Sequence, residues 1–190
     1  VSPVSPLYPA DLEQAESVVA FTDARTTCET RPSRTLRLLV NSENSFKVSM
    51  ARQIAAAFTA AGAATETVEL PWEEYTAALT AGRFDLYYGE VRLTADWDVS
   101  SLLATGGSLN YGGWSDPQCD QLLEGCRSGG NREAAFRGLC RYLQSQAPIL
   151  PICFKTVSTL YESDVLEGLT PTAAEPFYGL ENISIHLRAN

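Results

Sequence analysis

The chain offers few side chains that could do acid–base or nucleophilic chemistry. Its single histidine is His186, so a catalytic triad or a histidine general base would have to use this residue near the carboxyl end. Paired acids occur at Glu73-Glu74 and at Asp96 and Asp98, but adjacent side chains on a helix point in different directions. No serine, threonine or cysteine lies in a sequence motif typical of a catalytic nucleophile. We therefore expect the protein not to be an enzyme.

The cysteines form no metal or redox motif. There are five, and none of them forms a C-x-x-C pair. The cysteine spacing of zinc ribbons and of thioredoxin-type active sites is therefore absent. An odd number in a chain of this size is typical of buried small apolar residues. Cys119, Cys126 and Cys140 fall on two successive predicted helices and could permit one disulfide, a point that the sequence leaves open. We expect no metal and no cofactor.

Composition and charge limit the class of protein and of partner. With 190 residues, 45% apolar and 19% charged, the chain is typical of a folded domain. Its net charge of −9 would repel a phosphate backbone, so we expect no nucleic-acid partner. The chain lacks both a signal-peptide pattern and an initiator methionine, and it starts in a proline-rich stretch. We interpret it as a piece of a longer protein.

The pattern of apolar residues predicts an α/β fold with a mostly parallel sheet flanked by helices. The central elements are strands over 36–40, 63–70 and 84–90, joined by helices over 46–61 and 71–82, which Gly62 and Gly82 end. Helices follow from 117 and over 132–146, then a buried or edge strand over 148–154, which 157–161 could pair with, and a last strand over 183–187. Residues 1–35 are predicted to be an extended segment, a short helix and a loop, and residues 36–190 the α/β domain.

The candidate site follows the third strand. Ligands of open α/β sheets bind beyond the carboxyl ends of the strands, so we expect a site in the segment after Tyr88. Its candidate residues are Glu90, Arg92, Asp96, Trp97, Asn110 and Tyr111.

Each candidate also has an ordinary structural interpretation. Asp96 could cap the turn at 98–101, Trp97 could pack into the core, and Arg92 could be a solvated surface arginine. The glycines of 110–114 are explained by turn formation alone, and Glu90 has no assigned chemistry. We expect Trp72 and Tyr75, three residues apart on one helix, to lie in the core.

The order of several short motifs resembles the carboxyl-terminal lobe of family 5 solute-binding proteins of ABC transporters, the group that binds oligopeptides, dipeptides and nickel. The resemblance covers roughly residues 8–187. The matching motifs are ELPWEEY at 69–75, GRFDL at 82–86, ADWD at 95–98, NYGGWSDP at 110–117 and APILP at 147–151.

The resemblance implies one lobe of a two-lobed, extracytoplasmic receptor that closes over a peptide or peptide-like solute and delivers it to an ABC permease. The other lobe of the receptor would supply the second wall of the cleft. In family members that bind free peptides, an acidic residue in an Ala-Asp-aromatic segment pairs with the peptide's ammonium group, and Asp96 occupies that place. A carboxylate that faces a cation in a closed cleft gains more than an exposed pair does.

The chain also departs from the family's pattern near Asp96. Many peptide binders have a tryptophan before the aspartate, where this chain has Leu93 and Thr94, and an Asp-Pro after it, where this chain has Asp98-Val99. Alternatives therefore stay open: a nickel chelate, a sugar or another solute as ligand, or a ligand-sensing domain of a transcription regulator with the same fold.

Overall fold

The structure, a computed structural model, describes residues 33–94, 96–128, 130–155, 160–162, 164–172, 175 and 177–186. The short helix expected in residues 1–35 and most of the segment 157–161 therefore lie outside the described residues. The elements are β1 (Leu36–Asn41), α2 (Ser45–Ala60), β2 (Thr65–Leu70), α3 (Trp72–Thr80), β3 (Leu86–Tyr88), α4 (Ser100–Leu103), α5 (Pro117–Ser128), α6 (Arg132–Gln146), β4 (Leu166–Glu167), the 3₁₀ turn η2 (Leu180–Asn182) and β5 (Ser184–Ile185).

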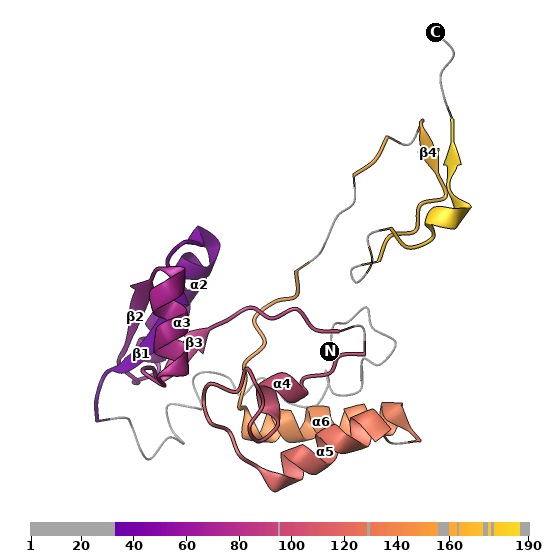
Figure 1. The fold of residues 1–190 in the computed structure, drawn as a ribbon. Coiled ribbons are helices and arrows are strands. Elements are labelled where there is room, and N and C mark those ends of the chain that lie inside the picture. The colour runs from indigo at the N-terminus through magenta and orange to yellow at the C-terminus, as the bar shows by residue number, and fades with distance from the viewer. Residues whose placement is uncertain are drawn as a thin grey trace.

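The central sheet has three parallel strands in the order β2-β1-β3 (Figure 1). The register pairs Leu38 of β1 with Thr67 of β2 on one side and with Leu86 of β3 on the other. Parallel strands need crossover connections, and α2 and α3 supply them. The predicted α/β class with a parallel sheet flanked by helices is confirmed.

The alternation of side chains along β1 explains why one helix covers each face of the sheet. Leu38 and Val40 pack against α2, whereas Leu39 packs against α3, because successive side chains of a strand point to opposite faces. The helical side chains in these two cores are Val48, Ala51 and Ala55 on α2 and Tyr75, Ala78 and Leu79 on α3.

Local sequence signals set the ends of both helices. The side chain of Asn44 accepts a hydrogen bond from the amide of Lys47 at 3.0 Å and so caps α2. Gly62 and Gly82 follow α2 and α3 with φ of 96° and 64°, in the left-handed region that glycine adopts without strain. The predicted stops at these two glycines are confirmed.

A second core joins α4, α5 and α6. Asp116 begins α5 by accepting hydrogen bonds from the amides of Gln118 and Cys119, and the hydroxyl of Tyr142 on α6 donates to the same carboxylate at 2.6 Å. The buried members of this core are Leu103, Cys119, Leu123, Cys126, Phe136 and Leu139. The described cysteines, Cys119, Cys126, Cys140 and Cys153, are all free thiols.

The prediction of a strand over 148–154 is wrong. These residues are all described and form no strand; Pro148 and Pro151 lack the amide hydrogen that a strand's ladder needs. The segment instead runs beside the end of β3, where Lys155 forms an ion pair with Glu90 at 2.7 Å and Phe154 contacts Trp97.

The predicted last strand is shorter than expected. β5 covers Ser184–Ile185 and pairs in antiparallel orientation with β4. The sequence pattern did not predict β4, because a strand of two residues has no detectable alternation.

Candidate functional site

The carboxyl end of β3 is fixed from the α3 side. The buried hydroxyl of Tyr75 donates a hydrogen bond to the carbonyl oxygen of Tyr88 at 3.0 Å, and burial raises the pKa of that hydroxyl. A Cβ at Gly89 would lie 2.9 Å from the ring of Tyr87, so a larger residue here would require that ring to move. Tyr75 lies in the core as predicted, but Trp72 does not: its side chain is 53% exposed and stacks on the ring of Tyr75.

Glu90 bridges two lysines from distant parts of the chain. Its carboxylate lies 2.8 Å from Nζ of Lys47 on α2 and 2.7 Å from Nζ of Lys155. These hydrogen bonds, the one from Lys155 first, hold the pKa of Glu90 below its ordinary value. Sequence reasoning missed both lysines because neither belongs to a motif. The bridge ties the exit of β3 to α2 and to the segment after α6.

Asp96 is exposed and takes part in a local turn. A hydrogen bond from the Thr94 side chain is the main reason that the pKa of Asp96 lies below its ordinary value, and the backbone at residues 96 and 98 and the charge of Arg132 act in the same direction. Asp98, rather than Asp96, accepts the hydrogen bond from the amide of Ser100 at 2.8 Å, at the start of α4. Asp96 is therefore an ionised carboxylate held at the surface.

Trp97 anchors the connection between β3 and α4. Its φ is 58°, a left-handed conformation that is uncommon for a residue with a side chain, and its amide donates to the carbonyl oxygen of Thr94 at 3.0 Å. The indole ring packs against the α4–α6 core and meets the ring of Phe154 edge to face, with centroids 5.6 Å apart. These contacts fix Trp97, the residue directly after Asp96.

Asn110 and Tyr111 have clear packing roles. The side-chain nitrogen Nδ2 of Asn110 donates to the carbonyl oxygens of Ala104 and Trp114, and its side-chain oxygen accepts from the backbone amide of Trp114. Tyr111 packs against the α3 core and contacts the ring of Tyr87 edge to face. The loop at residues 110–114 thus joins the helical core to the sheet, and the hydrogen bonds of Asn110 hold the shape of this loop.

The structure places three of the predicted site residues on one exposed segment. Glu90, Arg92 and Asp96 lie on the connection that leaves β3, and all three are exposed. Tyr111, on the loop between α4 and α5, contacts the ring of Tyr87 on β3. The arrangement is an open surface at the carboxyl edge of the sheet, with an anionic group at Asp96.

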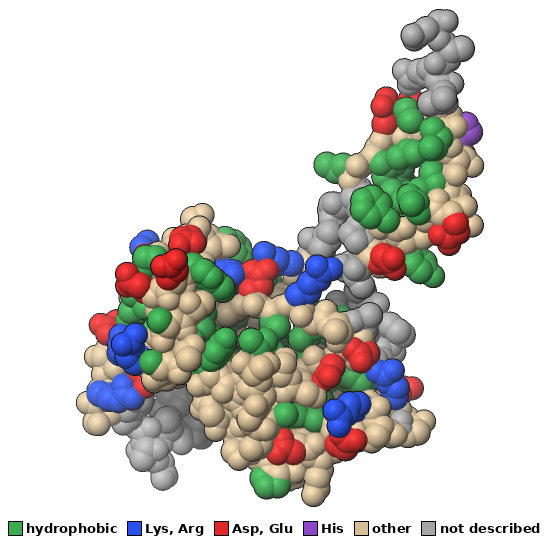
Figure 2. Space-filling view, in the orientation of Figure 1, with side chains coloured by type: hydrophobic (Ala, Val, Ile, Leu, Met, Phe, Trp, Pro, Cys, Tyr) green, Lys and Arg blue, Asp and Glu red, His purple; other side chains and the backbone are tan. Residues whose placement is uncertain are grey.

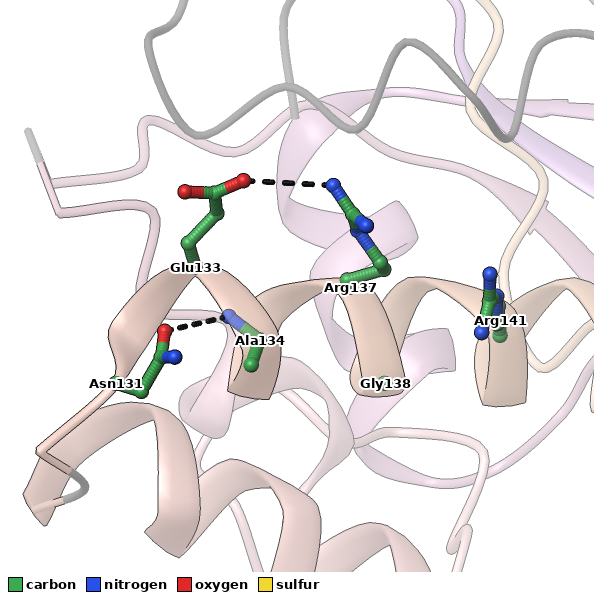
Figure 3. Close-up of a pocket in the computed structure, with 6 residues that line it drawn as sticks. All are labelled: Asn131, Glu133, Ala134, Arg137, Gly138 and Arg141. Carbon is green, nitrogen blue, oxygen red and sulfur yellow. Dashed lines mark hydrogen bonds and ion pairs between the residues drawn. The ribbon is translucent and has the colours of Figure 1, made fainter.

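One surface hollow that the sequence did not predict lies on α6. Its volume is about 420 Å³, and one face of α6 with the preceding residue lines it (Figure 3): Asn131, Glu133, Ala134, Arg137, Gly138 and Arg141. Glu133 and Arg137 pair across it at 3.4 Å, and the side chain of Asn131 accepts a hydrogen bond from the amide of Ala134 as the cap of the helix. The hollow is separate from the six predicted site residues, none of which lines it.

Neither a metal-binding cluster nor a membrane-spanning helix occurs in the described part of the chain. No cluster of three or more His, Cys, Asp or Glu side chains there could hold a metal ion. No helix in that part is long and apolar enough to cross a membrane.

Comparison with solved structures identifies the fold. The murein tripeptide binding protein MppA of Escherichia coli matches 78% of this chain with a TM-score of 0.64 and 20% identity. OppA of Haemophilus influenzae, solved in complex with the peptide RPPGFSPFR, matches 80% with a TM-score of 0.59 and 19% identity. The chain has the fold of a solute-binding-protein lobe. The resemblance to family 5 solute-binding proteins is thereby confirmed at the level of the fold.

The same fold occurs with a different ligand. NikZ of Campylobacter jejuni, solved in complex with Ni(L-His), matches 60% of this chain with a TM-score of 0.51 and 17% identity. The chain spans only about a third of MppA and OppA and a quarter of NikZ, with 32%, 31% and 25% of their lengths covered. No family model and no curated protein matches the sequence.

Proposed function

We propose that the chain is the ligand-binding lobe of an ABC-transporter solute-binding protein that captures peptides or peptide-like solutes for import. The observation that carries the proposal is the shared fold with MppA and OppA, combined with an exposed carboxylate, Asp96, on the connection beyond the carboxyl end of the sheet. Open α/β sheets bind their ligands at that edge.

Asp96 supplies the group that selects the ligand in this proposal. Its carboxylate stays ionised because the Thr94 side chain donates to it, and Trp97 and Asp98 hold the turn around it. A peptide's free ammonium group would pair with this carboxylate. Closure of a second lobe would remove water and strengthen the pair.

The mechanism is a population shift between an open and a closed receptor. Ligand contacts to both lobes exist only in the closed form, so binding favours closure. This chain would provide one wall, and the remaining part of a longer, extracytoplasmic polypeptide would provide the other wall and the surface that meets the permease. The role is binding without turnover.

The test is to identify what the protein carries. The protein is purified from its own cells in whatever length they produce it, measured by native mass spectrometry, and then denatured to release bound molecules. We expect a mixture of short peptides with free amino ends. Release of a sugar or a metal chelate would overturn the peptide assignment, and a protein that carries no ligand and binds no peptide in titration would overturn the receptor function. Turnover of a bound solute that is lost in Asp96→Asn would contradict a pure binding role.

A further inference from the structure

The chain has two lysines, and the structure brings both to the same carboxylate. The sequence otherwise uses arginine for its strong cations, with twelve of them. Nζ of Lys47 on α2 lies 2.8 Å from Oε2 of Glu90, and Nζ of Lys155 lies 2.7 Å from Oε1 of the same side chain. An ammonium group is a compact charge whose three donors can turn toward a new acceptor. We call these three side chains the lysine cluster.

The lysine cluster carries an excess of positive charge. One carboxylate lies between two ammonium groups, so the three side chains together keep one positive charge. The side chain of Lys47 is 16% exposed, whereas that of Lys155 is 65% exposed. An anion that comes from solvent would therefore meet Lys155 first, at an ammonium group that Glu90 neutralises only in part.

Tyr88, the last residue of β3, lies within range of the same charges. Burial is the main reason that the pKa of its hydroxyl lies above the ordinary value, and the charge of Glu90 acts in the same direction, while Lys155 opposes it. The hydroxyl therefore stays protonated and can donate a hydrogen bond to an anion beside Lys155.

The lysine cluster shares its surface with Asp96. Glu90 and Asp96 lie on the same exposed connection after β3, and the contact between the rings of Trp97 and Phe154 brings this connection beside the segment that carries Lys155. Figure 2 shows basic and acidic side chains gathered on the surface between the sheet and the elements β4 and β5. An acidic and a basic group on one surface match a ligand that carries both charges.

We propose that Lys155 binds a carboxylate of the solute, and that Glu90 holds this position in the absence of the solute. The site rests on the function proposed above and completes its ligand, which carries a free carboxylate besides its ammonium group, as a short unblocked peptide does. Lys47, the more buried lysine, keeps Glu90 paired when Lys155 changes partner. Glu90 is thus an internal competitor of the ligand's carboxylate.

The presence of two lysines makes a direct measurement simple. The 190-residue chain is labelled with carbon-13 at the lysine ε position, so that its NMR spectrum has one signal from each lysine, and Lys155→Arg identifies the signal of Lys155. The probes are trialanine and trialanine amide, both with a free amino end. We expect trialanine to shift the Lys155 signal saturably, and the amide to bind at least about fivefold more weakly because it lacks the carboxylate.

Two variants test the binding group and its competitor, with affinities read from backbone amide signals. Lys155→Met keeps the apolar stem without the charge and should abolish the preference for trialanine over its amide. Glu90→Gln removes the competing carboxylate and should strengthen the binding of trialanine at least about threefold, without an equal gain for the amide. Glu69→Gln is the matched control, since it removes the same charge from a carboxylate paired with Arg52 at 2.7 Å; it should change neither affinity by more than about 1.5-fold.

The outcomes separate this site from the receptor function. Equal affinities for trialanine and its amide, or a preference that Lys155→Met retains, would overturn the carboxylate site and leave the peptide-binding function standing. If neither probe binds, the chain is titrated with sodium acetate and, at equal ionic strength, with sodium chloride. A saturable Lys155 shift with acetate alone would support the site and contradict the peptide assignment. Identical responses to both salts would show screening only and would overturn the site.

Discussion

Asp96 combines two properties that a ligand-binding carboxylate requires. It is exposed at the carboxyl edge of the sheet, and a hydrogen bond from the Thr94 side chain holds its pKa below the ordinary value. Asp98 differs, because its side chain accepts a local hydrogen bond from the amide of Ser100 at the start of α4. The structure therefore separates the two neighbouring aspartates by what they contact.

Replacement of Asp96 tests its proposed role in the receptor. We expect Asp96→Ala to weaken binding of a peptide with a free amino end at least about tenfold, because the buried ammonium loses its partner. The same substitution should have little effect on an N-acetylated peptide, which carries no ammonium. Isothermal titration with both peptides, and with Glu73→Gln as a surface control, measures the difference. Equal affinities of Asp96→Ala and the unsubstituted receptor for the free peptide would remove Asp96 from the site.

Asp85 makes the stability of the sheet sensitive to acid. Its carboxylate pairs with the guanidinium of Arg34 and accepts from the amide of Arg37 at 2.8 Å, and the hydrogen bond from Arg34 is the main reason that its pKa is lowered. A lowered pKa in the folded state contributes stability above the ordinary pKa of about 4, and that contribution is lost as the pH falls through the folded pKa.

The pH dependence of unfolding should therefore change in Asp85→Asn. We expect the unsubstituted chain to melt at a higher temperature than Asp85→Asn near neutral pH, and the difference to shrink as the pH falls below about 4. Thermal melts followed by circular dichroism across this range measure it. A difference that stays constant from neutral to acidic pH would show that Asp85 stabilises the fold by something other than its charge.

At the scale of elements, β1 is the strand on which both cores of the sheet depend. It lies between β2 and β3, and its side chains enter the cores on both faces of the sheet. Leu39 is fully buried against α3, so removal of its side chain would leave a cavity that the neighbouring helix fills only in part. By contrast, Leu150 belongs to a segment that forms no strand and is 60% exposed.

Alanine substitutions should separate these two leucines. We expect Leu39→Ala to lower the free energy of unfolding by about 2–5 kcal/mol, and Leu150→Ala by no more than about 0.5 kcal/mol. Denaturant titrations of the two variants measure both values. A loss in Leu150→Ala as large as that in Leu39→Ala would mean that residues 148–154 pack as the strand predicted from the sequence.

At the scale of the molecule, the open site is the main feature. Three of the predicted ligand residues, Glu90, Arg92 and Asp96, are exposed, and the chain spans about a third of the length of MppA and OppA. A binding site that buries most of its ligand needs surfaces on both sides. The proposed receptor therefore depends on polypeptide beyond this lobe.

A comparison of two lengths of the protein tests this dependence. We expect the 190-residue chain alone to bind a given peptide at least about 100-fold more weakly than a polypeptide that also carries a second lobe, because half of the contacts and the exclusion of water are missing. Titration of both with the same peptide measures the ratio. Equal affinities would place the whole site on this lobe and contradict the two-lobed mechanism.

The sequence by itself determined the elements whose signals are local. Apolar periodicity and the stops at Gly62 and Gly82 predicted the sheet and its helices, because these signals act within a few residues of the chain. Short motifs in a fixed order were enough to predict the fold class that the solved structures share.

The tertiary structure alone decided which distant side chains meet. The pairing of Glu90 with Lys47 and Lys155 and the contact of Trp97 with Phe154 join residues far apart in sequence. No local pattern encodes such contacts, since they depend on how the crossovers and the helical core place separate segments side by side. For the same physical reason the exposed apolar side chains around β4, η2 and β5 became visible only in three dimensions.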